Sequence, residues 1–254
     1  MLLNEIKNFS LIYIVFIFIL FIMKKAKIDK SKLLLLAGTR MSLQLILAGY
    51  ILTYIFNNSN PIFTFTYLIS MIFFTIYRVI SKNTDMNRKF KITTAFAIAL
   101  SNLSMITFFI LCILKKDIST PQYVIPISGM LLGNTMNSTS IGIRYFYTTL
   151  KNKRLEIQTL INIGATPEKI SLPYIKEALE TALIPTINSM LGMGIVTLPG
   201  MMTGQILAGS SPMIAIFYQI SITIAISGVV CFSTFLTLIL GYKTLWSKEG
   251  SFYF

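Results

Sequence analysis

The sequence has no histidine and only two cysteines, and acidic residues are scarce, nine in 254. A multi-histidine or cysteine-cluster zinc site and a histidine-based catalytic triad are therefore excluded. A disulfide framework would need more cysteines, and both of these lie inside apolar runs. Only 12% of the residues are charged, against roughly 25% in a soluble domain, while 54% are hydrophobic. This balance excludes a water-soluble globule.

Two further absences narrow the function. No segment has the Gly-x4-Gly-Lys-Ser/Thr pattern of a nucleotide-binding loop. The acidic residues lie in polar loops or tails, which argues against proton relay or acid–base catalysis inside a membrane. We therefore expect a chain that is not an enzyme and that binds no cofactor itself.

Long apolar stretches, separated by short polar breaks, make up most of the chain. A helix that crosses about 30 Å of hydrocarbon needs roughly 20 apolar residues, and most of the stretches reach that length. There are seven: Phe9–Met23, Leu33–Phe56, Ile62–Ile80, Ile92–Leu114, Tyr123–Ile143, Ala182–Leu207 and Ile214–Leu240. The sequence thus predicts an all-α polytopic membrane protein with about seven transmembrane helices, forming a single domain over residues 1–254.

The positions of lysine and arginine predict the orientation. If the polar segments alternate between two sides, 18 of the 22 basic residues fall on one side and three on the other, while Arg40 lies inside a stretch. Basic residues favour the cytoplasmic side, so we expect the N-terminus outside and the C-terminus in the cytoplasm. The net charge of +13 is then a topology signal, and no nucleic-acid partner is needed.

The longest polar segment, residues 144–180, falls on the predicted cytoplasmic side. Gly164 indicates a helix end, Thr166 an N-cap and Pro167 a first helical position, and Glu168 suits the positive end of a helix. Residues at a near-helical period precede the glycine: Leu155, Thr159 and Ile163. We predict a helix–turn–helix at the membrane surface that docks a cytoplasmic protein; a plain solvated connector is the alternative.

Amide and hydroxyl side chains stand out within two of the stretches. Asn134 and Asn137 share one helical face, and Asn188 and Ser189 follow in the next stretch. In hydrocarbon such groups must face another helix or water, so they either hold helices together or line a polar pathway. Pro185 and Pro199 are expected to bend or break the helix of this stretch, as is common around translocation routes.

An arginine inside an apolar stretch and a set of methionines each allow two interpretations. Arg40, with Gln44 one turn further on, either marks a functional site or extends to the cytoplasmic surface. Methionine thioethers, Met201 and Met202 among them, suit a soft metal but are also ordinary core fillers. No metal ligands can be assigned.

Several strings in the chain resemble the permease subunit of the FetB-type ABC transporters. That family is linked to iron export and also includes plant aluminium-tolerance membrane proteins. The strings lie at residues 38–50, 124–134, 160–167, 182–186 and 194–209, and the most specific is the last, GIVTLPGMMTGQILAG.

The resemblance implies a permease that works as a homodimer in the cytoplasmic (inner or plasma) membrane, with a separate ATPase subunit that binds the ATP. It implies that the segment 144–180 is a coupling loop, with candidate coupling residues Glu156, Gly164, Ala165, Thr166, Pro167 and Glu168. Candidate pathway residues are Arg40, Gln44, Asn134, Asn137, Asn188, Ser189, Pro199, Gly200, Met201 and Met202. Export of a metal ion, with iron first, is the leading hypothesis. Transport of a small organic solute such as a nucleotide sugar, and a scaffold or sensor that moves nothing, are the alternatives.

Overall fold

The computed structural model describes residues 11–58 and 60–246. Within this part of the chain the regular secondary structure is helical and contains no β-strand. The chain divides into two compact units, residues 1–58 and 59–254. The single domain expected for residues 1–254 remains a prediction.

The first unit is a helical hairpin. Helix α2 (Ile12–Lys25) and helix α3 (Ser31–Asn57) are joined by a short turn. The ring of Phe16 on α2 packs against Gly38 of α3, where a larger residue would collide with it. The hydroxyl groups of Tyr13 and Ser42 lie 2.6 Å apart and link the same two helices. Most of the large apolar side chains of both helices are exposed in the chain itself, as expected for helices that contact lipid.

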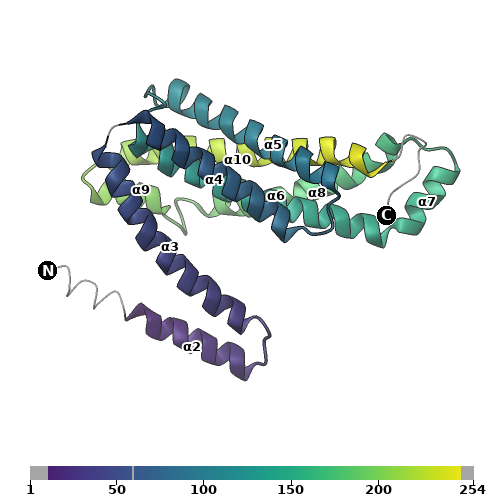
Figure 1. Ribbon diagram of the computed structural model, residues 1–254, viewed down its shortest axis with the longest axis horizontal. Coiled ribbons are helices and arrows are strands. Elements are labelled where there is room, and N and C mark those ends of the chain that lie inside the picture. Colours follow the sequence, from purple (N-terminus) through teal and green to yellow (C-terminus); the bar gives the residue numbers. More distant parts are fainter. Residues whose placement is uncertain (1–10, 59, 247–254) are drawn as a thin grey trace. The chain divides into compact units, whose positions relative to one another are not determined.

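The second unit is a bundle of long helices. Figure 1 shows these helices running side by side, with α7 at one end of the bundle and α9 near the other. The elements are α4 (Pro61–Lys82), α5 (Arg88–Phe108), the π-helical η1 (Phe109–Ile113), α6 (Pro121–Asn152), α7 (Arg154–Asn162), α8 (Pro167–Gly192), α9 (Gly200–Leu207), α10 (Pro212–Tyr242) and the 3-10 turn η2 (Lys243–Leu245).

Local sequence signals set the starts of these helices. The side chain of Asn60 accepts from the backbone N–H of Ile62 at the start of α4, at 3.0 Å. Asn87 does the same for Phe90 at the start of α5, at 2.7 Å. Proline, whose missing N–H is no loss at the first helical position, opens four of the helices: α4, α6, α8 and α10.

Three helices approach one another closely at Gly142 of α6. A Cβ atom at this position would lie 2.9 Å from Cγ2 of Thr234 on α10 and 3.2 Å from Cβ of Ala182 on α8. Such separations are below normal van der Waals contact, so only glycine fits without displacing a neighbour. Gly142 therefore allows α6 to pack closely against both α8 and α10.

Within residues 11–58 and 60–246, four helical segments are long and apolar enough to cross a membrane: Ser31–Asn57, Pro61–Lys82, Arg88–Ile113 and Pro212–Leu245. These segments confirm the prediction of an all-α membrane protein. Helices α6 and α8 have 32 and 26 residues, but both carry many polar side chains and are not among the four. The count of seven spans and the orientation therefore remain predictions.

The polar segment 144–180 is more regular than a loop. Helix α6 continues to Asn152, α7 follows after one residue, and α8 begins at Pro167 and runs without interruption to Gly192. The sixth apolar stretch accordingly forms the end of α8, an irregular segment over 193–199, and α9. The expected break lies before Pro199, where Gly194 has φ +82°, whereas Pro185 lies inside α8 and does not break it.

Candidate functional site

The turn between α7 and α8 has the geometry that its sequence predicts. Gly164 adopts φ +83°, a conformation that favours glycine. The N–H of Gly164 donates to the carbonyl of Ile161 at 2.9 Å, and the N–H of Ala165 donates to that of Leu160 at 3.0 Å. These two bonds satisfy carbonyl groups at the end of α7 that have no partner within the helix.

Helix α8 starts immediately after this turn. The Thr166 hydroxyl accepts from the N–H of Lys169 at 3.4 Å, Pro167 occupies the first helical position, and Glu168 lies in the first turn. The predicted helix–turn–helix is thus confirmed, with its N-cap at the predicted residue. We call α7, the turn 163–166 and the first part of α8 the α7–α8 hairpin.

Buried apolar side chains fix the hairpin to the bundle. Ile157 of α7 is fully buried, and Ile170 and Tyr174 of α8 are 3% exposed, in a cluster that also contains Leu245 of η2. The indole N–H of Trp246 donates to the Ser171 hydroxyl at 3.2 Å. The hairpin is therefore a packed part of the second unit.

Glu156 joins α7 to α8. The Tyr174 hydroxyl donates to the Glu156 carboxylate at 3.4 Å, and Lys153 lies 3.5 Å from the same carboxylate and 5.5 Å from the centre of the Tyr174 ring. Burial, and then the negative charge of Glu156, raise the pKa of the Tyr174 hydroxyl above its usual value. The structure thus gives Glu156 a role in holding the two helices of the hairpin together.

Two apolar side chains at α7 are exposed, Leu155 within the helix and Ile163 directly after its end. Leu155 is 80% exposed and Ile163 is 74% exposed, and the exposed Thr159 lies between them at the helical repeat. Exposed apolar side chains that share one face of a helix are a feature of protein-binding surfaces.

The amide and hydroxyl side chains predicted as pathway residues lie on the surface of the second unit. Asn134 and Asn137 of α6 are exposed, as are Asn188 and Ser189 of α8. The Asn134 amide donates to the carbonyl of Met130 in its own helix at 2.8 Å. None of the four is enclosed by this unit, so any pathway that they line lies at its surface.

The other pathway candidates are divided between the two units. Arg40 and Gln44 are exposed on α3 of the first unit. In the second unit, Pro199 directly precedes α9, and Gly200, Met201 and Met202 form its first turn. The two methionines are half-buried.

The sequence reasoning missed a buried polar seam inside the second unit. Asn102 of α5 is fully buried; its amide donates to the carbonyl of Ile98 at 2.9 Å and its oxygen accepts from Thr135 of α6 at 3.3 Å. The hydroxyl groups of Thr139 on α6 and Thr234 on α10 lie 3.3 Å apart. The signal was present, because Asn102 is the one amide in the apolar stretch Ile92–Leu114.

No group of three or more His, Cys, Asp or Glu side chains in residues 11–58 and 60–246 is arranged to hold a metal ion. The buried polar groups described above are hydroxyls and an amide. Their contacts link α5, α6 and α10, which is the role that such side chains commonly have in membrane bundles.

Comparison with known proteins matches the chain to one family of membrane proteins. The model of an uncharacterised protein family, UPF0014, matches residues 6–246. A UPF0014 membrane protein of Synechocystis is 38% identical over 192 residues, covering 74% of this chain and 73% of that protein. The UPF0014 membrane protein YjkA of Bacillus subtilis is 32% identical over 240 residues, which cover 94% of this chain and 95% of that protein.

A third relative carries a functional name. The "Probable iron export permease protein FetB" of Escherichia coli is 31% identical over 225 residues, covering 89% of this chain and 86% of that protein. This match confirms the resemblance to FetB-type permeases that the sequence strings indicated. No solved structure matches the chain.

Proposed function

The chain belongs to the UPF0014 family of membrane proteins, and from this premise we propose that it is the permease subunit of an ABC transporter. In this proposal the chain crosses the cytoplasmic (inner or plasma) membrane seven times, with the N-terminus outside and the C-terminus in the cytoplasm. A separate ATPase subunit binds and hydrolyses ATP, and this chain carries out no covalent chemistry.

The observation that carries the proposal is the pair of exposed apolar side chains on the α7–α8 hairpin, one in α7 and one directly after its end. Leu155 and Ile163 are 80% and 74% exposed, while Ile157 on the other side of the same helix is fully buried. The hairpin is therefore fixed to the bundle on one side and offers apolar surface on the other. An apolar patch on a rigid support, flanked by charged residues, suits the core of a protein–protein interface.

The continuity of α8 provides a route for mechanical coupling. This helix has 26 residues and starts at the hairpin turn, so it extends for about 39 Å at 1.5 Å per residue. It carries Asn188 and Ser189 near its far end. Closure of the ATPase would displace the hairpin, and α8 would carry that displacement to the region of these polar residues, switching the bundle between inward-open and outward-open states.

The exposed amides support a homodimer. In a single chain, three amide side chains lie on the surface of the second unit: Asn134, Asn137 and Asn188. Each amide group that faces hydrocarbon without a hydrogen-bond partner costs several kcal/mol of free energy. In the proposed homodimer, two copies bring these faces together around a polar pathway. Each copy then contributes the residues that it cannot enclose alone.

The proposed substrate is a metal ion, with iron first, because the relative from Escherichia coli is named a probable iron export permease. Iron is cargo in this proposal and needs no resident site in the chain. A nucleotide sugar is the substrate that would replace it in the assay below.

The test is reconstitution of the permease with its candidate ATPase in proteoliposomes. We expect the permease to stimulate ATP hydrolysis and ferrous iron to change that rate. A Leu155→Asp/Ile163→Asp double variant should lose the stimulation, whereas the matched Leu155→Met/Ile163→Met variant, which keeps the face apolar, should retain it.

Three results would overturn parts of this proposal. If iron has no effect and a nucleotide sugar changes the rate, the metal substrate is wrong. If the aspartate variant stimulates as well as the wild type, α7 is not the docking element. If the permease never alters ATP hydrolysis, a scaffold or sensor replaces the transporter.

A further inference from the structure

A basic cleft lies between α4, α6 and α8 of the second unit. It consists of two adjoining cavities of about 80 Å³ and 380 Å³, which share Lys82, Arg144 and Thr148 in their linings. The smaller cavity extends along the loop after α4 to Asp85, and the larger one extends to Thr181 of α8. Neither the proposed coupling nor the proposed pathway uses this cleft.

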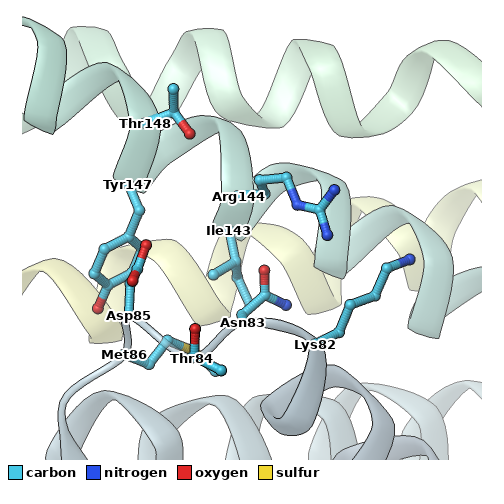
Figure 2. Close-up of a pocket in the computed structure, with 9 residues that line it drawn as sticks. All are labelled: Lys82, Asn83, Thr84, Asp85, Met86, Ile143, Arg144, Tyr147 and Thr148. Carbon is cyan, nitrogen blue, oxygen red and sulfur yellow. The ribbon is translucent and has the colours of Figure 1, made fainter. Parts of the chain in front are cut away.

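The charge balance of the cleft is positive. Asp85 is paired with Lys151, whose ammonium lies 2.8 Å from its carboxylate. Lys82 and Arg144 have no ion pair or side-chain hydrogen bond with any residue in the described part of the chain. Figure 2 shows the ends of these two side chains extending to the same side of the pocket, while Asp85 lies on the other side near Tyr147.

One further carboxylate lies near the rim. Glu177 of α8 accepts a hydrogen bond from the hydroxyl of Tyr145, which lines the larger cavity, at 3.3 Å. The charges of Asp85 and Lys151 cancel each other. The two remaining cations, Lys82 and Arg144, therefore exceed the one remaining anion, Glu177. An anionic group that enters the cleft therefore meets net positive charge, together with the hydroxyl group of Thr148 as a donor.

The position of the cleft in the bundle points to the source of that anion. Lys82 is the last residue of α4, a helix long and apolar enough to cross a membrane, so the cleft lies at the depth of the lipid headgroups. Ile141 lines the larger cavity, and Ile184, one turn beyond Thr181 on α8, is 50% exposed. Apolar surface thus continues from the cleft towards the interior of the membrane, where an acyl chain would lie.

We propose that this cleft binds the phosphate of an anionic phospholipid headgroup. Lys82 and Arg144 contact the phosphate oxygens in charge-assisted hydrogen bonds, and the Thr148 hydroxyl donates to a remaining headgroup oxygen. Basic pockets between transmembrane helices on the cytoplasmic side commonly take anionic headgroups. The proposal needs only that the chain spans a membrane, and it stands independently of the transported substrate.

The experiment is native mass spectrometry of the purified full chain, titrated with phosphatidylglycerol or with phosphatidylcholine of the same acyl chains. We expect tighter binding of phosphatidylglycerol. The Lys82→Gln/Arg144→Gln variant should bind it about thirtyfold more weakly, at about 1 kcal/mol for each basic residue. The charge-keeping Lys82→Arg/Arg144→Lys variant should retain it.

A matched control variant removes two positive charges from residues outside the cleft. Arg88 and Lys89 are exposed in the first turn of α5 and do not line the cleft, so Arg88→Gln/Lys89→Gln should bind phosphatidylglycerol within about twofold of the wild type. Circular dichroism of each variant, compared with the wild type, checks that the helices are intact.

The proposal is overturned if both lipids bind equally, or if the folded Lys82→Gln/Arg144→Gln variant binds phosphatidylglycerol like the wild type. It is also overturned if inorganic phosphate or glycerol phosphate displaces phosphatidylglycerol at comparable concentration. That last result would assign the cleft to a soluble phosphate.

Discussion

Replacing Gly142 by alanine tests the close approach of α6, α8 and α10. The added Cβ would lie 2.9 Å from Cγ2 of Thr234 and 3.2 Å from Cβ of Ala182, so a neighbouring helix must move. Gly133, in the same helix, is the matched control, because a Cβ there meets no atom within 4 Å. The two substitutions make the same chemical change and differ only in the space available.

The expected effects have opposite signs. Overpacking a tight contact costs about 1–3 kcal/mol, and alanine recovers about 1 kcal/mol of helix propensity relative to glycine. Gly142→Ala should therefore lower the free energy of unfolding by about 1 kcal/mol, whereas Gly133→Ala should raise it by up to about 1 kcal/mol. For a chain of this size, 1 kcal/mol corresponds to about 2–4 °C in Tm.

Thermal unfolding of the purified variants in one detergent, followed by circular dichroism, measures both shifts. A lower Tm for Gly142→Ala and a higher Tm for Gly133→Ala would support the packing described here. If Gly142→Ala raises Tm as much as Gly133→Ala, the three helices do not meet closely at Gly142, and the reasoning is refuted.

Three other predictions concern the hairpin, the buried polar contact of Asn102 and the exposed amides. Chemical denaturation should show that Ile157→Ala, at a fully buried position, lowers the free energy of unfolding by about 2–5 kcal/mol. The control Leu155→Ala, at an exposed position, should change it by less than about 0.5 kcal/mol. Equal effects of the two substitutions would mean that Ile157 does not pack against the bundle. Asn102→Leu should cost about 1–3 kcal/mol, because it leaves its buried threonine partner without an acceptor. Asn134→Leu and Asn188→Leu, at exposed positions, should keep Tm within about 2 °C and abolish transport in proteoliposomes; normal transport by both would make these amides structural.

Local signals made much of the fold predictable. The runs of apolar residues predicted the helices, because a helix of that length satisfies the backbone groups of such a run within the segment itself. The turn at Gly164 and the cap at Thr166 were predicted correctly, since both depend on a few neighbouring residues. The extent of α8 was harder to foresee, because Pro173 and Pro185 are accommodated inside it.

The candidate site was only partly predictable, because the orientation of a helical face depends on its neighbours. The spacing of Asn134 and Asn137 placed them on one face of α6, but it could not indicate that this face is exposed while Thr135 and Thr139 face the interior. The buried Asn102 was missed for the same reason. The basic cleft also escaped prediction, because Lys82 and Arg144 lie far apart in the sequence and meet only when α4 packs against α6.

The side of the membrane on which the α7–α8 hairpin lies decides whether a cytoplasmic ATPase can bind it. In a chain with Cys112→Ser and Cys231→Ser, a single Ile163→Cys substitution places one thiol at an exposed position of the hairpin. A membrane-impermeant maleimide should label this thiol in inside-out vesicles and leave it unlabelled in intact cells. Labelling in intact cells would place the hairpin outside, where no ATP-hydrolysing partner could reach it.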